Sequence, residues 1–155
     1  MNLFVDKHIE LLKTLLKYNV DFIIIGGYSV IFHGYKRTTG DVDIWVKPDN
    51  ANKQKVLLAL KEIKIDANSI GEIGKLDFTG YVVFCIWEEP EKADFITRIN
   101  LVKYEDADKN KIIGDMDGVK IPFLHLNDLV LSKMNTGRGK DKADIEELQK
   151  IKKFL

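Results

Sequence analysis

A pair of aspartates separated by one apolar residue constrains the fold more than any other feature of the chain. The pair is Asp41 and Asp43, and the apolar Val42 and Ile44 alternate with them. In a strand, residues two apart point to the same face and their Cα atoms lie about 6.6 Å apart. We therefore expect both carboxylates on one face of a strand, with Val42 and Ile44 buried on the other.

Two carboxylates on one face usually need a cation or a hydrogen-bond donor between them. At about 4 Å apart they repel each other by about 4 kcal/mol if the effective dielectric constant is about 20. Hard oxygen ligands suit Mg²⁺, or the similar Mn²⁺, which proteins hold with one or two carboxylates plus substrate phosphates. The pattern predicts that Asp41 and Asp43 are metal ligands. The alternative is a solvent-facing pair on an amphipathic edge strand.

A glycine pair supplies a second chemical signal. Gly26 and Gly27 follow the apolar run 22–25 and precede a helix that we expect to begin within residues 28–32 and to end near Gly34. Such a turn presents free backbone N–H groups, and glycine lets a phosphate approach them closely. A phosphate-binding turn beside paired carboxylates indicates chemistry on a nucleoside triphosphate. A plain structural turn is the alternative.

The rest of the chain alternates helix and strand signals without repeats. Helices are predicted over about residues 4–18, from a cap at Asn50 to about Ile63, from Asn127 or Asp128 to near Gly137, and over about 140–154. Strands are predicted over 21–25, 41–46 and 93–96, with hairpins pairing 76–78 with 81–87 and 112–116 with 119–123. Residues 66–75 resemble a loop. This order predicts an α+β (α/β mixed) class: a mixed sheet with helices packed on it, as a single domain over residues 1–155.

Composition limits the partners and the compartment. The 24 basic and 24 acidic residues balance, so bulk charge does not argue for nucleic-acid binding. No apolar run approaches the roughly 18 residues of a membrane span, and the first residues lack the form of a signal peptide. Cys85 is the single cysteine, which excludes an intrachain disulfide and fits a reducing cytosol. We expect a cytoplasmic protein without a membrane partner.

Taken together, the motifs resemble a known superfamily. The resemblance to the nucleotidyltransferases related to DNA polymerase beta rests on Gly26-Gly27, His33-Gly34, Arg37, Thr39, Asp41, Asp43 and Ile44-Trp45-Val46. Within that superfamily the chain is most similar to the compact bacterial AbiEii-like branch, which the late stretches 126–133 and 137–148 also resemble. The resemblance implies a metal-dependent enzyme that moves an NMP from an NTP to an acceptor hydroxyl and releases pyrophosphate.

The resemblance also implies roles for single residues. Asp94 takes the place of the third acidic ligand, so that the catalytic and metal-binding set is Asp41, Asp43 and Asp94; Asp77 is the rival for the third position. The nucleotide-binding candidates are Gly26, Gly27, Ser29, Arg37 and Lys133. Much of the superfamily has serine directly after the first glycine, where this chain has Gly27. Arg37 suits a phosphate or a neighbouring acid equally.

Two residue groups near the carboxyl terminus have competing interpretations. Lys133 either reaches a phosphate or is a solvated helix lysine, whereas Arg138, Asp141 and Asp144 are expected to form a structural ion-pair network.

The sequence leaves the acceptor open: a partner protein, a tRNA end or a small molecule such as an aminoglycoside. Two other functions stay under consideration, a toxin–antitoxin component that acts through a protein partner and a catalytically inactive binding module.

Overall fold

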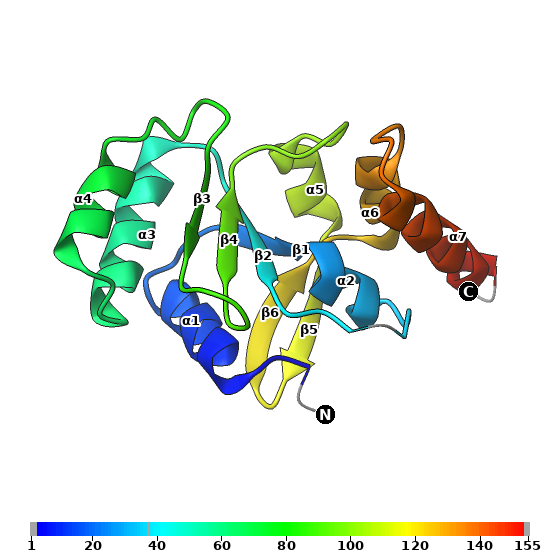
Figure 1. Cartoon of the computed structure of the whole chain (residues 1–155), viewed down its shortest axis with the longest axis horizontal. Coiled ribbons are helices and arrows are strands. Elements are labelled where there is room, and N and C mark those ends of the chain that lie inside the picture. The colour runs from blue at the N-terminus through cyan, green and yellow to red at the C-terminus, as the bar shows by residue number, and fades with distance from the viewer. Residues whose placement is uncertain (1–2, 37, 154–155) are drawn as a thin grey trace.

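A mixed six-stranded sheet forms the centre of the molecule (Figure 1). The computed structural model describes residues 3–36 and 38–153. The strands are β1 (Phe22–Ile25), β2 (Val42–Val46), β3 (Val83–Ile86), β4 (Ala93–Ile96), β5 (Ile112–Met116) and β6 (Val119–Phe123), in the order β3-β4-β2-β1-β6-β5. β2 runs antiparallel to β1 and parallel to β4, while β1 runs parallel to β6. The outermost strand at each edge runs antiparallel to its neighbour: β3 to β4 and β5 to β6. The predicted α+β class with a mixed sheet is confirmed.

Helices cover both faces of the sheet. They are α1 (Asp6–Lys17), α2 (Gly26–Phe32), α3 (Asn50–Glu62), α4 (Ala67–Gly74), α5 (Tyr104–Asn110), α6 (Leu126–Lys133) and α7 (Gly139–Lys153). Side chains of α1, α3 and α4 form one apolar cluster with Ile24 and Ile44. Side chains of α5, α6 and α7 form another with Ile23 and Trp45. Because successive strand residues point to opposite faces, the two clusters lie on opposite sides of the sheet.

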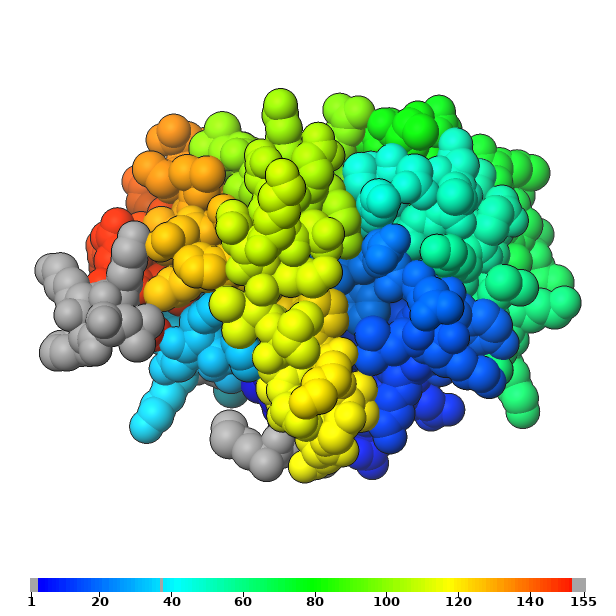
Figure 2. Space-filling model, turned by 180° about the vertical axis from the view of Figure 1, so that it is seen from behind, coloured from blue at the N-terminus to red at the C-terminus, as the bar shows by residue number. Residues whose placement is uncertain are grey.

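The reverse side of the molecule shows how these elements meet. In Figure 2 a band from α5 through the β5–β6 hairpin runs down this side, between α6 in orange and α1 and α3 in blue and cyan. The hairpin turns at Asp117 and Gly118, which both have positive φ, of 54° and 87°. That backbone is the tight two-residue turn that an Asp-Gly pair predicts. None of the helices in the described part of the chain is long and apolar enough to cross a membrane.

The central strand β2 contains Asp43 and the buried alternation predicted for it, but not Asp41. Val42 and Ile44 are fully buried in the cluster under α1 and α3. Trp45 points to the other face, where its Nε1–H donates to the Thr97 carbonyl at 2.9 Å. Asp43 shares that second face with Trp45 because the two residues are two positions apart. Asp41 lies directly before the strand, which begins at Val42 and not at residue 41.

Three local predictions are wrong. Residues 66–75 are not a loop: they contain α4, capped by Asp66, whose side chain accepts a hydrogen bond from the Ser69 N–H at 2.9 Å. Residues 76–78 are not a strand, and β3 pairs with β4 instead. The cap of α3 is Asp49, which accepts from the Asn52 N–H. The side chain of Asn50 instead binds the Phe78 N–H at 3.0 Å, which holds that segment as a turn.

Candidate active site

The three predicted catalytic aspartates lie together at one end of the sheet. Asp43 of β2 and Asp94 of β4 are direct partners in the parallel ladder, and Ile25 pairs with Asp43 on the other side. Asp41 is two residues before Asp43. Burial raises the pKa of the Asp43 carboxyl to about 6, with further contributions from the charges of Asp94 and Asp41. The aspartates are therefore close enough to repel one another.

The glycine turn lies directly against this cluster. Gly26 starts α2 with a φ of +67°, a conformation that residues with a side chain rarely adopt. A Cβ atom at this position would lie 2.9 Å from Cγ of Asp43 and closer still to its Oδ2. Only glycine therefore allows the turn and the carboxylate to meet. The next residue, Gly27, is buried and lines a cleft beside Asp41.

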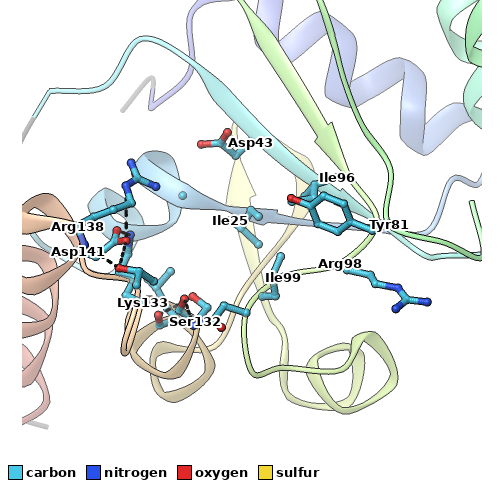
Figure 3. Close-up of a pocket in the computed structure, with 14 residues that line it drawn as sticks. Ile25, Asp43, Tyr81, Ile96, Arg98, Ile99, Ser132, Lys133, Arg138 and Asp141 are labelled. Atoms are coloured by element: carbon cyan, nitrogen blue, oxygen red, sulfur yellow. Dashed lines mark hydrogen bonds and ion pairs between the residues drawn. The ribbon is translucent and has the colours of Figure 1, made fainter.

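Two clefts open at this point, and both include Asp43 and Arg138. The first, which we call the mixed cleft, has a volume of about 630 Å³. In Figure 3, Asp43 lies between Lys133, Arg138 and Asp141 on one side and Tyr81 and Arg98 on the other. Its apolar wall is formed by Ile25, Ile96, Ile99 and Leu129. The second, the polar cleft, has about 600 Å³ and is lined by Gly27, Thr38, Thr39, Gly40, Asp41, Asp43, Glu89, Arg138 and Lys140.

The loop before β4 brings two further charged side chains to the aspartates. A hydrogen bond between the carboxyl groups of Glu89 and Asp41 raises the pKa of Glu89. The ammonium of Lys92 lies 3.3 Å from Oδ1 of Asp94, and this hydrogen-bonded ion pair raises the pKa of Lys92. Sequence reasoning missed both residues. The only signal was an acidic run, Glu88-Glu89-Pro90-Glu91, directly before the strand.

A cationic wall faces Asp43 from α6 and α7. Lys133 lies 3.0 Å from Oδ2 of Asp144 and 3.4 Å from Oδ1 of Asp141, and only 10% of its side chain is exposed. The Thr136 hydroxyl donates to Asp141 at 2.7 Å. The expected network of Arg138, Asp141 and Asp144 thus includes Lys133, which is not a solvated helix lysine. The charges of Lys140 and Lys133 lower the pKa of Asp43 and partly oppose the effect of burial.

Comparison with models of protein families shows which family the chain belongs to. Residues 5–154 match the model of a family described as nucleotidyl transferase of unknown function, DUF2204. The chain belongs to this nucleotidyl transferase family. No curated protein matches the sequence. The narrower placement in an AbiEii-like branch stays a prediction.

Two solved structures share the fold of this nucleotidyl transferase. One is the lincosamide antibiotic adenylyltransferase LnuA in its lincomycin-bound form, at 21% identity and a TM-score of 0.57, with 97% of this chain and 99% of that chain covered. The other is a candidate nucleotidyltransferase from Thermotoga maritima, at 16% identity and a TM-score of 0.57, with 96% and 94% covered. At these identities the likeness extends to the fold and not to the substrates.

Three predicted residues of this nucleotidyl transferase need separate mention. Ser29 is fully buried, lines neither of the two clefts and has no hydrogen-bond partner for its hydroxyl among the described residues. Arg37 lies outside the described residues. Asp77, the rival third ligand, also lines neither cleft, and its carboxylate accepts hydrogen bonds from Asn50 and from the N–H and hydroxyl of Thr79. Those bonds lower its pKa.

The donor set suits a divalent cation that also binds substrate. Within residues 3–36 and 38–153, no three Asp, Glu, His or Cys side chains surround one point closely enough to hold a metal by themselves. Asp94 is engaged with Lys92, and Asp41 with Glu89. Mg²⁺, however, is typically held by one or two carboxylates and completed by substrate phosphates. A cation here would also relieve the repulsion that Asp43 experiences from its two neighbours.

Proposed function

We propose that this nucleotidyl transferase moves an NMP from an NTP to an acceptor hydroxyl, with Mg²⁺ or Mn²⁺ held by Asp41, Asp43 and Asp94. The observation that carries the proposal is the direct contact between Gly26 and Asp43. It supports a site in which the backbone of a phosphate-binding turn and a metal-binding carboxylate act on the same triphosphate. The Asp43 partner across the parallel ladder, Asp94, then lies beside the same phosphates.

The two clefts suit different parts of the substrates. The polar cleft offers backbone amides at Gly27 and Gly40 and the cations Arg138 and Lys140, which fit a triphosphate. The mixed cleft offers an apolar wall and the exposed ring of Tyr81, which fit a nucleoside or an acceptor. Asp43 lines both clefts. The reacting phosphorus would therefore lie where they meet.

The chain's own residues bind the phosphates and accept the proton of the acceptor. When bound, the metal neutralises the charge that develops on the phosphates. The amides of Gly26 and Gly27 donate to the outer phosphates. Asp94 accepts the proton of the acceptor hydroxyl. The freed oxygen then bonds to the α-phosphorus, while the bond between the α-phosphorus and the pyrophosphate oxygen breaks. Arg138 and Lys140, which line the polar cleft beside Asp43, stabilise the departing negative charge.

A labelling experiment tests the reaction and identifies the acceptor. The protein is incubated with each labelled NTP, Mn²⁺ or Mg²⁺, and a cell extract. We expect one NTP to transfer label to an acceptor with the parent and with Asp77→Asn, and a loss of at least about 100-fold with Asp43→Asn, because transition-state charge stabilisation depends on the metal. Transfer by Asp43→Asn at the parental rate would place the reaction elsewhere. A toxin–antitoxin role stays a prediction, which the adjoining genes test.

A further inference from the structure

We propose that Lys92 is a built-in counter-ion of the metal site, which withdraws from Asp94 when a metal and a nucleotide bind together. Free metal would then bind weakly, and the nucleotide would strengthen its binding. This inference rests on the proposed metal-dependent function. Lys92 would thereby make the nucleotide and its metal bind as a unit, and would keep the carboxylates from retaining a metal alone.

The position of Lys92 is fixed by its backbone. Its carbonyl accepts a hydrogen bond from the Val42 N–H at 3.2 Å, and Val42 is the residue between Asp41 and Asp43. The side chain is one-third exposed and places Nζ 3.3 Å from Oδ1 of Asp94. The backbone of Lys92 is thus bonded to β2, while its ammonium neutralises the Asp94 carboxylate of β4. This arrangement differs from that of a surface lysine that pairs with whichever acid is near.

A buried histidine fixes the preceding residue and ties the loop to the glycine turn. His8 is fully buried, and its Nε2 lies 3.0 Å from the Glu91 carbonyl. A carbonyl only accepts, so Nε2 carries the proton, and in the neutral ring Nδ1 accepts from the Tyr28 hydroxyl at 3.2 Å. Tyr28 belongs to α2, the helix that begins at Gly26. The loop that carries Lys92 is therefore connected to the element proposed to bind phosphates.

Electrostatics explains how the coupling arises. An ammonium and a divalent cation repel each other strongly at the distance of a shared carboxylate. A triphosphate adds negative charge at the same place, which compensates for both cations. The metal and the nucleotide therefore increase each other's affinity, and the increase is the same in both directions. Without the ammonium at position 92, free metal no longer has a competitor at Asp94.

Calorimetry with Mn²⁺ tests the inference without requiring turnover. Mn²⁺ is titrated into the full chain with and without a non-hydrolysable NTP. We expect Lys92→Gln to raise the affinity for free Mn²⁺ roughly two- to fivefold, as expected for a partly screened charge pair, and to reduce the enhancement by nucleotide by a similar factor. Lys92→Arg keeps the charge and should behave like the parent. Lys7→Gln is the matched control, because Lys7 pairs with Glu91 of the same loop at 3.9 Å.

The outcomes separate this inference from the proposed function. If Lys92→Gln binds free Mn²⁺ no more tightly than the parent, or if Lys7→Gln has the same effect, the inference is wrong while the metal site stands. If neither the parent nor Lys92→Gln binds Mn²⁺ even with nucleotide, the metal-dependent function is wrong and the inference is wrong with it. Circular dichroism of each variant verifies that the fold is retained.

Discussion

Asp43 makes the stability of the chain depend on pH. Its pKa is about 6 in the folded chain, compared with 3.8 for an ordinary aspartate. Between about pH 4 and pH 6 the folded chain holds a proton that the unfolded chain has released. Stability therefore falls as the pH rises through this window. Above it, the ionised Asp43 lowers the free energy of unfolding by about 2–3 kcal/mol.

Asp43→Asn should accordingly raise the melting temperature at pH 7.5 and have little effect at pH 4. Thermal denaturation of the parent and the variant at both values, without added metal, measures the difference. Asp77→Asn is the control: hydrogen bonds from Thr79 and Asn50 favour the charge of Asp77, so this variant should be less stable than the parent at pH 7.5. An equal shift for Asp43→Asn at the two pH values would contradict the assignment.

At the residue scale, the sequence predicted the motifs and missed their neighbours. Asp41, Asp43 and the glycine pair carry local patterns, namely strand alternation and a turn before a helix, and so could be recognised in advance. Glu89 and Lys92 carry no such pattern. Their loop is held by a contact between His8 and the Glu91 carbonyl, across a sequence separation of 83 residues. Local reasoning has no access to a contact of that kind.

At the scale of elements, one side chain of α3 joins two strands. Asn52 is buried, and its Oδ1 accepts from the Asp21 N–H at 2.9 Å. Its Nδ2 donates to the carbonyls of Asp21 at 3.0 Å and Lys47 at 3.2 Å. Asp21 directly precedes β1 and Lys47 directly follows β2. The Asn52 amide therefore links these two antiparallel strands at the end that faces α3.

Asn52→Leu should therefore lower the free energy of unfolding by about 1–3 kcal/mol, because the Asp21 N–H loses its acceptor. The carbonyls of Asp21 and Lys47 keep one donor each, the N–H groups of Lys47 and Asp49. Urea denaturation measures the change. Gln54→Leu, on an exposed position of the same helix, is the matched control and should change stability by less than about 0.5 kcal/mol. If the two variants behave alike, the amide is dispensable to the sheet.

The helices that were predicted wrongly or not at all have weak local signals in their sequences. The segment of α4, with glycines at positions 71 and 74, is a poor helix former by composition, and its helix depends on the Asp66 cap and on packing of Ile73. α5 was not predicted at all. It packs on the sheet through Ala107 and through Tyr104, whose ring lies edge-on to Trp45 at 5.1 Å between centroids. Packing against distant parts of the chain therefore contributes to the formation of both helices.

At the scale of the whole molecule, the last helix is attached to the rest through buried charge. Lys133 of α6 pairs with Asp141 and Asp144 of α7, and the three side chains are at most 10% exposed. Removal of one partner from a buried ion network is costly because the remaining charges are left in a place shielded from water. α7 therefore holds its position, and with it one wall of the mixed cleft, through this network together with the packing of Leu148.

Lys133→Met should lower the free energy of unfolding by about 3 kcal/mol, within the range for a broken buried pair. Lys142→Met, at an exposed position of α7, should be close to neutral. Urea denaturation distinguishes the two variants. A stable Lys133→Met chain that no longer binds NTP would instead assign the lysine to the phosphates alone.

The order of the strands could not be derived from the residues. β1 pairs with β6, where Ile24 is opposite Phe123, and β2 pairs with β4, where Asp43 is opposite Asp94. Parallel partners are brought together by long connections whose course no local pattern specifies. The adjacency of Asp43 and Asp94 was expected only from resemblance to a family. The class of fold, by contrast, followed from the alternation of helices and strands.

The contact between Gly26 and Asp43 also sets the order in which a descendant of this chain could lose its function. While the carboxylate is present, a side chain at position 26 collides with it. Substitution of Asp43 by a smaller residue removes that obstacle and leaves only the positive φ to restrict position 26. Decay towards an inactive relative would therefore begin at position 43 and only later reach position 26. A relative that has a side chain at position 26 and still has an aspartate at position 43 must have rebuilt the turn.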